Sequence, residues 1–385
     1  LLVCVPLLYP IVPPLTDLPA HMARFLIQTD GGRSPELARW YAVDWRLIPN
    51  LGADLLAQML VPWLGLAPAV KAIAVAIVAL QAAGYLLLSR VVHGRVSTSV
   101  LFALPLAYGE PFQYGFLNFT LAVALATLAL ALWLSPAMAA RPRLRWIVFG
   151  PITAIVWVCH LAGWAVLCLT IGTFELVSRL MRSEPPVPAL AGGFVACSSL
   201  LLPQVAAMLF LPASAHLPTT GFFLFHYKLR YLFDVLADRW VLLDVVSAGA
   251  LIALIVVARR SRDQRFDPRL AAAAGLLFAV FLVMPAWVFG SFYADMRLLP
   301  TAFALAIIAI APVARTRAWH LVTVAGAAFL LVRVASTTVS MAMWDRQLAS
   351  ETRVLGGVPV GSQLVTLNAR PCADFAALGR DRDTH

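Results

Sequence analysis

The chain is built from long apolar blocks separated by short loops, and this pattern constrains the fold more than any other feature of the sequence. Most blocks are about 15–23 residues long, close to the length with which an α-helix crosses a bilayer core. The chain is 61% hydrophobic and 12% charged, whereas a soluble domain averages about 25% charged residues. The blocks lie roughly at 1–15, 68–89, 96–109, 115–135, 146–160, 161–178, 189–211, 241–258, 270–289, 298–313 and 319–341. We therefore predict an all-α polytopic membrane protein with about eleven transmembrane helices, a bundle over residues 1–341.

The basic residues alternate between the loops, and this predicts which side each loop faces. The net charge of +10 does not indicate a nucleic-acid partner, because the arginines lie in short loops next to the apolar blocks. One set of loops carries Arg90, Arg95, Arg141, Arg143, Arg145, Arg179, Arg182, Arg259, Arg260, Arg262, Arg265, Arg269, Arg315 and Arg317. By the positive-inside rule these loops are cytoplasmic, which places residues 16–67, 212–240 and 342–385 outside. Lys71 and Lys228 are the only lysines; this bias towards Arg, with abundant Ala, suggests a bacterial inner membrane.

Three segments at or near the outer side have their own expectations. Residues 51–66 are apolar, but they carry Asp54 and Gln58 and are interrupted by Pro62. We expect an interfacial helix there that does not cross the membrane. Residues 1–15 are short for a span, and we interpret them as the end of a first helix whose beginning is missing. The polar segment 342–385 is expected to be the start of a truncated outer C-terminal segment.

The candidate chemistry begins directly after the first apolar block. Asp17, His21 and Arg24 are spaced so that a helix would bring all three near one face. A carboxylate at the membrane boundary could act as a general base. Asp17 could equally cap the helix that begins near Pro19, because Asp is favoured at the N-cap and Pro in the first turn. The two roles do not exclude each other.

Further polar residues lie in the other outer loops, each with two interpretations. Glu110 lies among aromatic residues that could line a sugar or lipid pocket, or could form an interfacial belt. His160, in a tight turn between two blocks, is either a structural hydrogen-bonding residue or a donor to a phosphate or sugar. The loop 212–240, with Lys228 and Arg230, is either a solvated face or part of a site. Asp295 and Arg297 begin a late block; Arg297 suits phosphate recognition, or it is an anchor paired with Asp295.

These residues and their positions resemble the GT-C superfamily of membrane glycosyltransferases, which includes protein O-mannosyltransferases and bacterial aminoarabinose transferases. The similarity covers the arrangement of spans and the long first outer loop. The local segment T-D-L-P-A-H-M-A-R is similar to the acidic motif of the first loop, although many members have a second acid where this chain has Leu18. His160 between paired spans and Asp295–Arg297 at the head of a late span also resemble the family.

The resemblance implies a function, a donor and roles for the residues. It implies a polyprenyl-phosphate-linked sugar donor, an acceptor glycan, lipid or protein, and Asp17 as the catalytic base. It also implies that Glu110 is a base or the acid of a divalent-metal site, and that Arg24, Lys228, Arg230 or Arg297 contact phosphate. Two other functions remain open: a transporter or flippase of lipid-linked sugars, and a non-catalytic envelope-assembly protein. A flippase should carry polar groups on both sides, whereas here they gather on the outer side.

Overall fold

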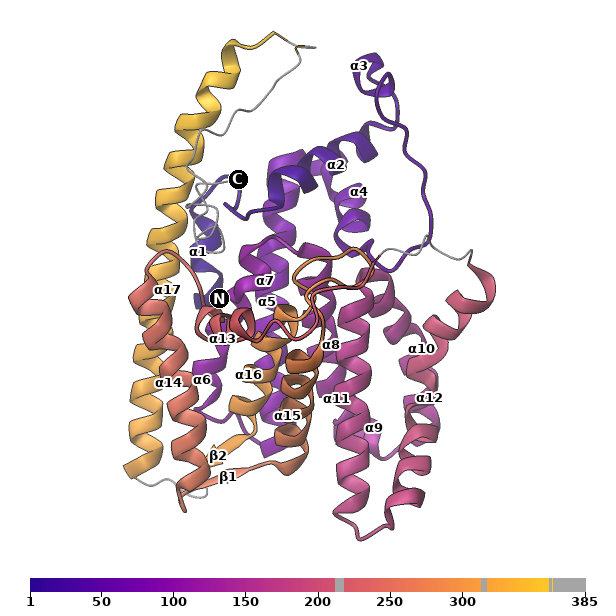
Figure 1. Ribbon diagram of the computed structural model, residues 1–385, viewed down its shortest axis with the longest axis vertical. Coiled ribbons are helices and arrows are strands. Elements are labelled where there is room, and N and C mark those ends of the chain that lie inside the picture. Colours follow the sequence, from indigo (N-terminus) through magenta and orange to yellow (C-terminus); the bar gives the residue numbers. More distant parts are fainter. Residues whose placement is uncertain (212–217, 313–316, 360–361, 363–385) are drawn as a thin grey trace.

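The structure is a computed structural model that describes residues 1–211, 218–312, 317–359 and 362. It is mostly helical, and among the described residues the only paired strands are β1 (Gln264–Phe266) and β2 (Ile310–Pro312), which run antiparallel (Figure 1). Within this part of the chain, six helices are long and apolar enough to cross a membrane. They are α5 (Leu66–His93), α10 (Pro142–Cys159), α11 (Leu161–Leu180), α12 (Pro186–Phe210), α14 (Val241–Arg260) and the segment Trp319–Gly357, which covers most of α17 (Arg317–Thr352) and η4 (Arg353–Gly357). The predicted helical fold is confirmed, and these helices indicate a multi-pass membrane protein.

Other predicted blocks form shorter helices. Three are apolar: α8 (Leu117–Trp133), α15 (Pro268–Val283), and η3 (Met296–Leu298) continued by α16 (Leu299–Ile308). Blocks 1–15 and 96–109 contain only short turns, namely η1 (Leu2–Cys4), α1 (Val5–Leu8), α6 (Val100–Ala103) and η2 (Leu104–Tyr108). Proline explains why block 1–15 does not form one continuous helix, because Pro10, Pro13 and Pro14 cannot donate the backbone hydrogen bonds that a continuing helix needs. The count of eleven spans therefore stays a prediction.

The first outer loop contains helices, as expected. They are α2 (Leu18–Asp30), α3 (Pro35–Ala38) and α4 (Gly52–Leu64). α2 ends where Gly31 adopts a left-handed conformation with φ of 62°, a backbone that glycine adopts without strain. α4 has 13 residues, so it is about 20 Å long, less than the roughly 30 Å of a bilayer core. This length agrees with the prediction that residues 51–66 do not cross.

Hydrogen bonds between loops fall into two groups at opposite ends of the bundle. At the lower end of Figure 1, β1 pairs with β2, and the Ser97 and Ser99 hydroxyls donate to the carbonyl of Ile310. At the end that carries α2, backbone N–H groups donate hydrogen bonds across loops, from Thr16 to Gln113, from Leu51 to Val158, and from Thr220 to Trp287. Each of these contacts joins loops that the arginine pattern assigns to the same side. The tail also differs from expectation, because α17 continues past residue 341 to Thr352; residues 360–361 and 363–385 lie outside the described part.

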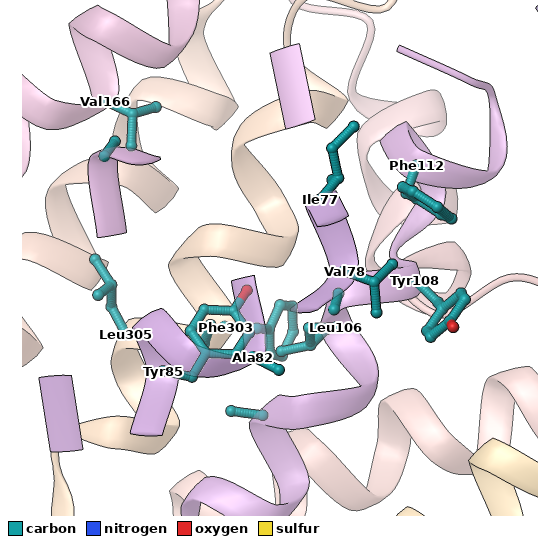
Figure 2. Packing of buried hydrophobic residues seen from close by; sticks show 14 of the residues in the cluster. Ile77, Val78, Ala82, Tyr85, Leu106, Tyr108, Phe112, Val166, Phe303 and Leu305 are labelled. Atoms are coloured by element: carbon teal, nitrogen blue, oxygen red, sulfur yellow. The ribbon is translucent and has the colours of Figure 1, made fainter. Parts of the chain in front are cut away.

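The core between these ends positions the turn that leads into α8. One core cluster contains Ile77, Val78 and Tyr85 of α5, Leu106, and Phe112 of the short helix α7 (Glu110–Gln113), and Figure 2 shows these side chains. α11 lies tightly against α8 on another side, because a side chain at Gly163 would collide with the Cβ of Ala122. The remaining elements are the one-turn helix α9 (Pro136–Ala139) and α13 (Phe225–Asp234). The start of α8 is therefore fixed from several directions.

Candidate functional site

The turn between α7 and α8, residues 114–116, is the centre of the site, and the start of α2 packs against it. The backbone N–H of Asp17 donates to the carbonyl of Tyr114 at 2.9 Å, and that of Thr16 donates to Gln113 at 3.2 Å. Gly115 has φ of +83°, and a Cβ there would lie 3.2 Å from the Asp17 nitrogen. Only glycine combines that conformation with such a close approach.

Asp17 occupies the N-cap position of α2, but its side chain makes no capping hydrogen bond. The carboxylate instead acts on Arg297, since the negative charge of Asp17 raises the pKa of that guanidinium against the lowering effect of burial. The two residues come from opposite ends of the chain. The structure therefore brings together the candidate base and a candidate phosphate ligand.

Arg297 lies at the start of a late helix, as the sequence predicted, and is only 7% exposed. Its Nη2 donates to the Ser291 hydroxyl and to the Phe292 carbonyl, both at 3.0 Å. The guanidinium lies over the ring of Phe116, 4.2 Å from the centroid, a favourable cation–π geometry. Burial lowers its pKa to about 10, so it is still cationic at neutral pH. Its buried Nε has no hydrogen-bond partner among the described residues.

His160 lies between α10 and α11 and faces Arg297. Its Nδ1 accepts a hydrogen bond from the backbone N–H of Ala162 at 3.0 Å, which caps α11. An accepting Nδ1 carries no proton, so the proton of the neutral ring is on Nε2. Burial, followed by the positive charge of Arg297, lowers the pKa of His160 to about 3, and the ring is neutral at physiological pH.

In the contact between His160 and Arg297, two hydrogen-bond donors therefore face each other. Nε2 of His160 lies 3.3 Å from Nη1 of Arg297, and neither atom can accept from the other in this tautomer. An oxygen placed between them would receive a hydrogen bond from each, and a negative charge on that oxygen would also neutralise the guanidinium. The arrangement is suited to an anionic oxygen.

His21 and Arg24 belong to an adjoining group that is organised by Asp54. Arg24 pairs with Asp54 at 2.8 Å, and its Nη2 lies 3.0 Å from Nδ1 of His21. Asp54 is 2% exposed and also accepts from Gln28 and Asn118, each at 3.0 Å. Burial and then Arg24 lower the pKa of His21 to about 4. This group joins α2, α4 and α8, and it occupies the Arg24 guanidinium. From the sequence, Asp54 was expected only to prevent residues 51–66 from crossing the membrane, and its role in this group was not predicted.

Lys228 and Asp295 bind each other. Nζ of Lys228 donates to Asp295 at 2.6 Å and to the carbonyls of Phe281 and Met284 at 2.7 and 2.8 Å. These three bonds use all three ammonium protons. Asp295 therefore pairs with Lys228, and Arg297 is free of the anchor role in which it would pair with Asp295. Arg230 lies apart on α13 and pairs with Asp234 of the same helix at 3.0 Å.

Glu110 is buried on the other side of the central turn, among tyrosines. Burial and then the carboxylate of Glu110 raise the pKa of Tyr114, whose ring centroid lies 4.9 Å from that of Tyr293. Tyr231 stands edge-on to Tyr293 at 6.4 Å, and burial, Asp295 and Glu110 raise its pKa in that order. Because the carbonyl of Tyr114 accepts from the backbone N–H of Asp17, and the carboxylate of Glu110 acts on the Tyr114 side chain, both acids neighbour Tyr114.

The residues gathered here do not fit a divalent metal. Across the described residues, no three His, Cys, Asp or Glu side chains are grouped so that they could hold an ion. Asp54, the most central carboxylate of its group, is already saturated by cationic and amide donors.

A second buried ion pair lies outside the predicted site. Arg333 of α17 donates to Asp244 at 2.8 Å and to the carbonyl of Leu236 at 2.6 Å, and both charged side chains are nearly fully buried. The Ser340 hydroxyl donates to Asp238 at 2.6 Å in the same network. Arg333 and Asp244 are each the only Asp, Glu, Lys or Arg in their apolar blocks. An isolated charge within a membrane span indicates a buried partner. That signal was in the sequence but was not used.

Comparison of the chain with known protein families, with curated proteins and with solved structures finds no match.

Proposed function

We propose that this chain is a membrane glycosyltransferase of the GT-C type, which moves a sugar from a polyprenyl-phosphate donor to an acceptor. On this proposal the chain spans a bacterial inner membrane about eleven times, with the α2 end of the bundle on the outer side. The arginine-rich loops of the other end would then be cytoplasmic.

The observation that carries this proposal is the pair of donors formed by Arg297 and His160 beside Asp17. Arg297 supplies a planar, positively charged guanidinium, and His160 supplies a neutral N–H donor. Together they suit a phosphate oxygen. Asp17 acts electrostatically on Arg297, so a carboxylate lies close to the same place. A lipid-linked phosphate keeps its tail in the bilayer and presents its headgroup at the end of the helices, where these residues lie.

The transfer would proceed as a single displacement. The acceptor hydroxyl gives its proton to the Asp17 carboxylate while its oxygen bonds to the anomeric carbon of the sugar. The bond between that carbon and the phosphate oxygen breaks, and its electron pair leaves with polyprenyl phosphate. Arg297 and His160 stabilise the charge that develops on this oxygen. An acceptor amine would react in the same way.

Two substitutions test the proposal, in protein reconstituted into nanodiscs with a panel of polyprenyl-phosphate sugars. Asp17→Asn should keep the fold, because Asn has nearly the same size and is favoured at an N-cap as much as Asp, and should keep the affinity for polyprenyl phosphate. Transfer should fall by about 10²–10⁴-fold, the usual effect of losing a general base. Arg297→Ala should weaken binding of polyprenyl phosphate itself, and Arg297→Lys should weaken it less.

Asp44→Asn is the matched control, since Asp44 is exposed and pairs with Arg46 of the same loop. It should leave binding and transfer unchanged. Intact transfer in folded Asp17→Asn protein would remove Asp17 as the base and direct attention to Glu110. Unchanged polyprenyl-phosphate affinity in Arg297→Ala would contradict the phosphate site.

A further inference from the structure

The far end of α2 borders a cavity that has no role in the proposed chemistry. It has a volume of about 290 Å³, near the lower limit of about 300 Å³ for small-molecule sites. Its walls come from the end of α2, the turn at Gly31 and Gly32, α3 and the following loop, and they include Gln28, Leu37, Tyr41 and Trp45. In Figure 1 this region lies around α3, at the extreme end of the molecule.

The walls of this cavity carry a single charged group. Asp30 is the only charged residue that lines it, and its two carboxylate oxygens accept from the backbone and the hydroxyl of Ser34 at 3.0 and 2.6 Å. The rings of Tyr41 and Trp45 are about half exposed. The cavity thus offers flat aromatic surfaces and neutral polar groups, which suits a ligand with apolar C–H faces and many hydroxyls.

Gln28 provides a specific polar contact for such a ligand. Its Nε2 donates to Asp54, while its Oε1 is buried and has no hydrogen-bond partner in the described part of the chain. A buried acceptor without a partner costs free energy, and a rotation of the Gln28 side chain towards the cavity would let this oxygen accept from a ligand hydroxyl.

The cavity and the candidate reaction centre lie at opposite ends of α2. Asp17 and Gln28 are about 16 Å apart along this helix, from eleven residues at 1.5 Å each. That distance exceeds the width of one sugar ring, so a ligand that reaches from the cavity to Asp17 must be a chain of sugars.

We infer that this cavity binds an uncharged oligosaccharide, which is the acceptor in the proposed transfer. Its inner sugars stack on Trp45 and Tyr41 and bond to Gln28, and its terminal hydroxyl lies at Asp17. The acceptor role rests on the proposed function, whereas the binding site stands on the cavity itself.

Binding should be measured with purified protein in nanodiscs and fluorescently labelled uncharged oligosaccharides, each in a length series from monosaccharide to hexasaccharide. Affinity should rise with chain length. Trp45→Ala should weaken binding of the longer members at least tenfold, Trp45→Phe should restore part of it, and Gln28→Ala should weaken it severalfold. Trp40→Ala is the matched control, because Trp40 is an exposed tryptophan of the same loop that does not line the cavity.

The outcomes separate this inference from the proposed function. If oligosaccharides bind through Trp45 but no donor supports transfer, the site survives and the proposed transferase fails. If transfer occurs but Trp45→Ala binds and transfers as the wild type does, the inference is overturned and the transferase stands. The inference is also overturned if the wild-type protein binds none of the oligosaccharides. It is overturned as well if the cavity instead binds an unstructured serine- and threonine-rich peptide through Trp45, which would indicate a protein acceptor.

Discussion

At the scale of single residues, the position of one proton on His160 determines what the site can accept. The Ala162 N–H occupies Nδ1, so Nε2 must be the donor, and Arg297 adds a second donor beside it. Protonating the ring would require Nδ1 to release Ala162 and would place two cations side by side. The ring is therefore held neutral by geometry, by burial and by its neighbour.

This neutrality predicts that acid destabilises the protein. His160 and His21 have pKa values of about 3 and about 4 in the fold, against an ordinary 6.5. Between these values and 6.5 the unfolded chain binds more protons, so the free energy of unfolding falls as the pH is lowered through that range. The loss from His160 approaches about 1.4 kcal/mol per pH unit.

Thermal unfolding in nanodiscs between pH 7 and pH 4 measures this effect. His160→Gln should lower the slope, because Gln does not titrate. His226→Gln, at an exposed histidine of α13, should leave it unchanged. A slope that is the same in His160→Gln as in the wild type would show that His160 is not held neutral.

At the scale of elements, two buried carboxylates determine how helices are joined. Asp54 of α4 binds side chains of α2 and α8, and Asp244 of α14 binds Arg333 of α17. Neither carboxylate can lose its partners without leaving a charge uncompensated in a region of low dielectric.

For the second pair we expect Arg333→Met to be strongly destabilising, by about 3–5 kcal/mol. Combining it with Asp244→Asn should recover part of the loss, because the amide carries no charge and its oxygen can still accept from Asp238. Arg346→Met, at an exposed position of the same helix, should change stability by no more than about 0.5 kcal/mol. Thermal unfolding of the single and double variants in detergent measures the coupling, and a stable Arg333→Met protein would refute it.

The comparison of sequence and structure at this scale shows what local pattern can predict. Blocks such as α5 and α14 are uniformly apolar and long, so hydropathy alone locates them. Residues 1–15 are equally apolar, but closely spaced prolines prevent one continuous helix.

The site was predictable as a set of residues but not as a set of contacts. Asp17, His160 and Arg297 were predicted from their places directly after, between and at the head of apolar blocks. That Lys228 pairs with Asp295, and Arg24 with Asp54, depends on long-range packing that no local spacing encodes.

At the scale of the whole molecule, the loops are sorted into two ends, and labelling can show which end is outside. In a variant that lacks the five native cysteines, Glu36→Cys and Leu229→Cys should react with an impermeant thiol reagent in intact cells. Arg262→Cys should react only after the membrane is permeabilised. Expression and insertion should be equal for all three, and labelling of Arg262→Cys alone in intact cells would invert the proposed orientation.

The backbone pairing around His160 has a consequence for how the protein is made. Residues 49–51 form backbone hydrogen bonds on both sides of His160. The N–H of Leu51 donates to the carbonyl of Val158 at 2.9 Å, and the N–H of Leu161 donates to the carbonyl of Pro49 at 3.0 Å. The chain also passes very close at Gly52, where a Cβ would lie 2.9 Å from the backbone of Cys159. The ribosome completes residues 49–52 long before residue 160, and Arg297 is later still. In the proposed orientation, the first outer loop must therefore be translocated before α10 and α11 are inserted, and it can pair with them only afterwards. Formation of the site is a late event in biogenesis, and a chain arrested before η3 would contain the candidate base Asp17 but not Arg297.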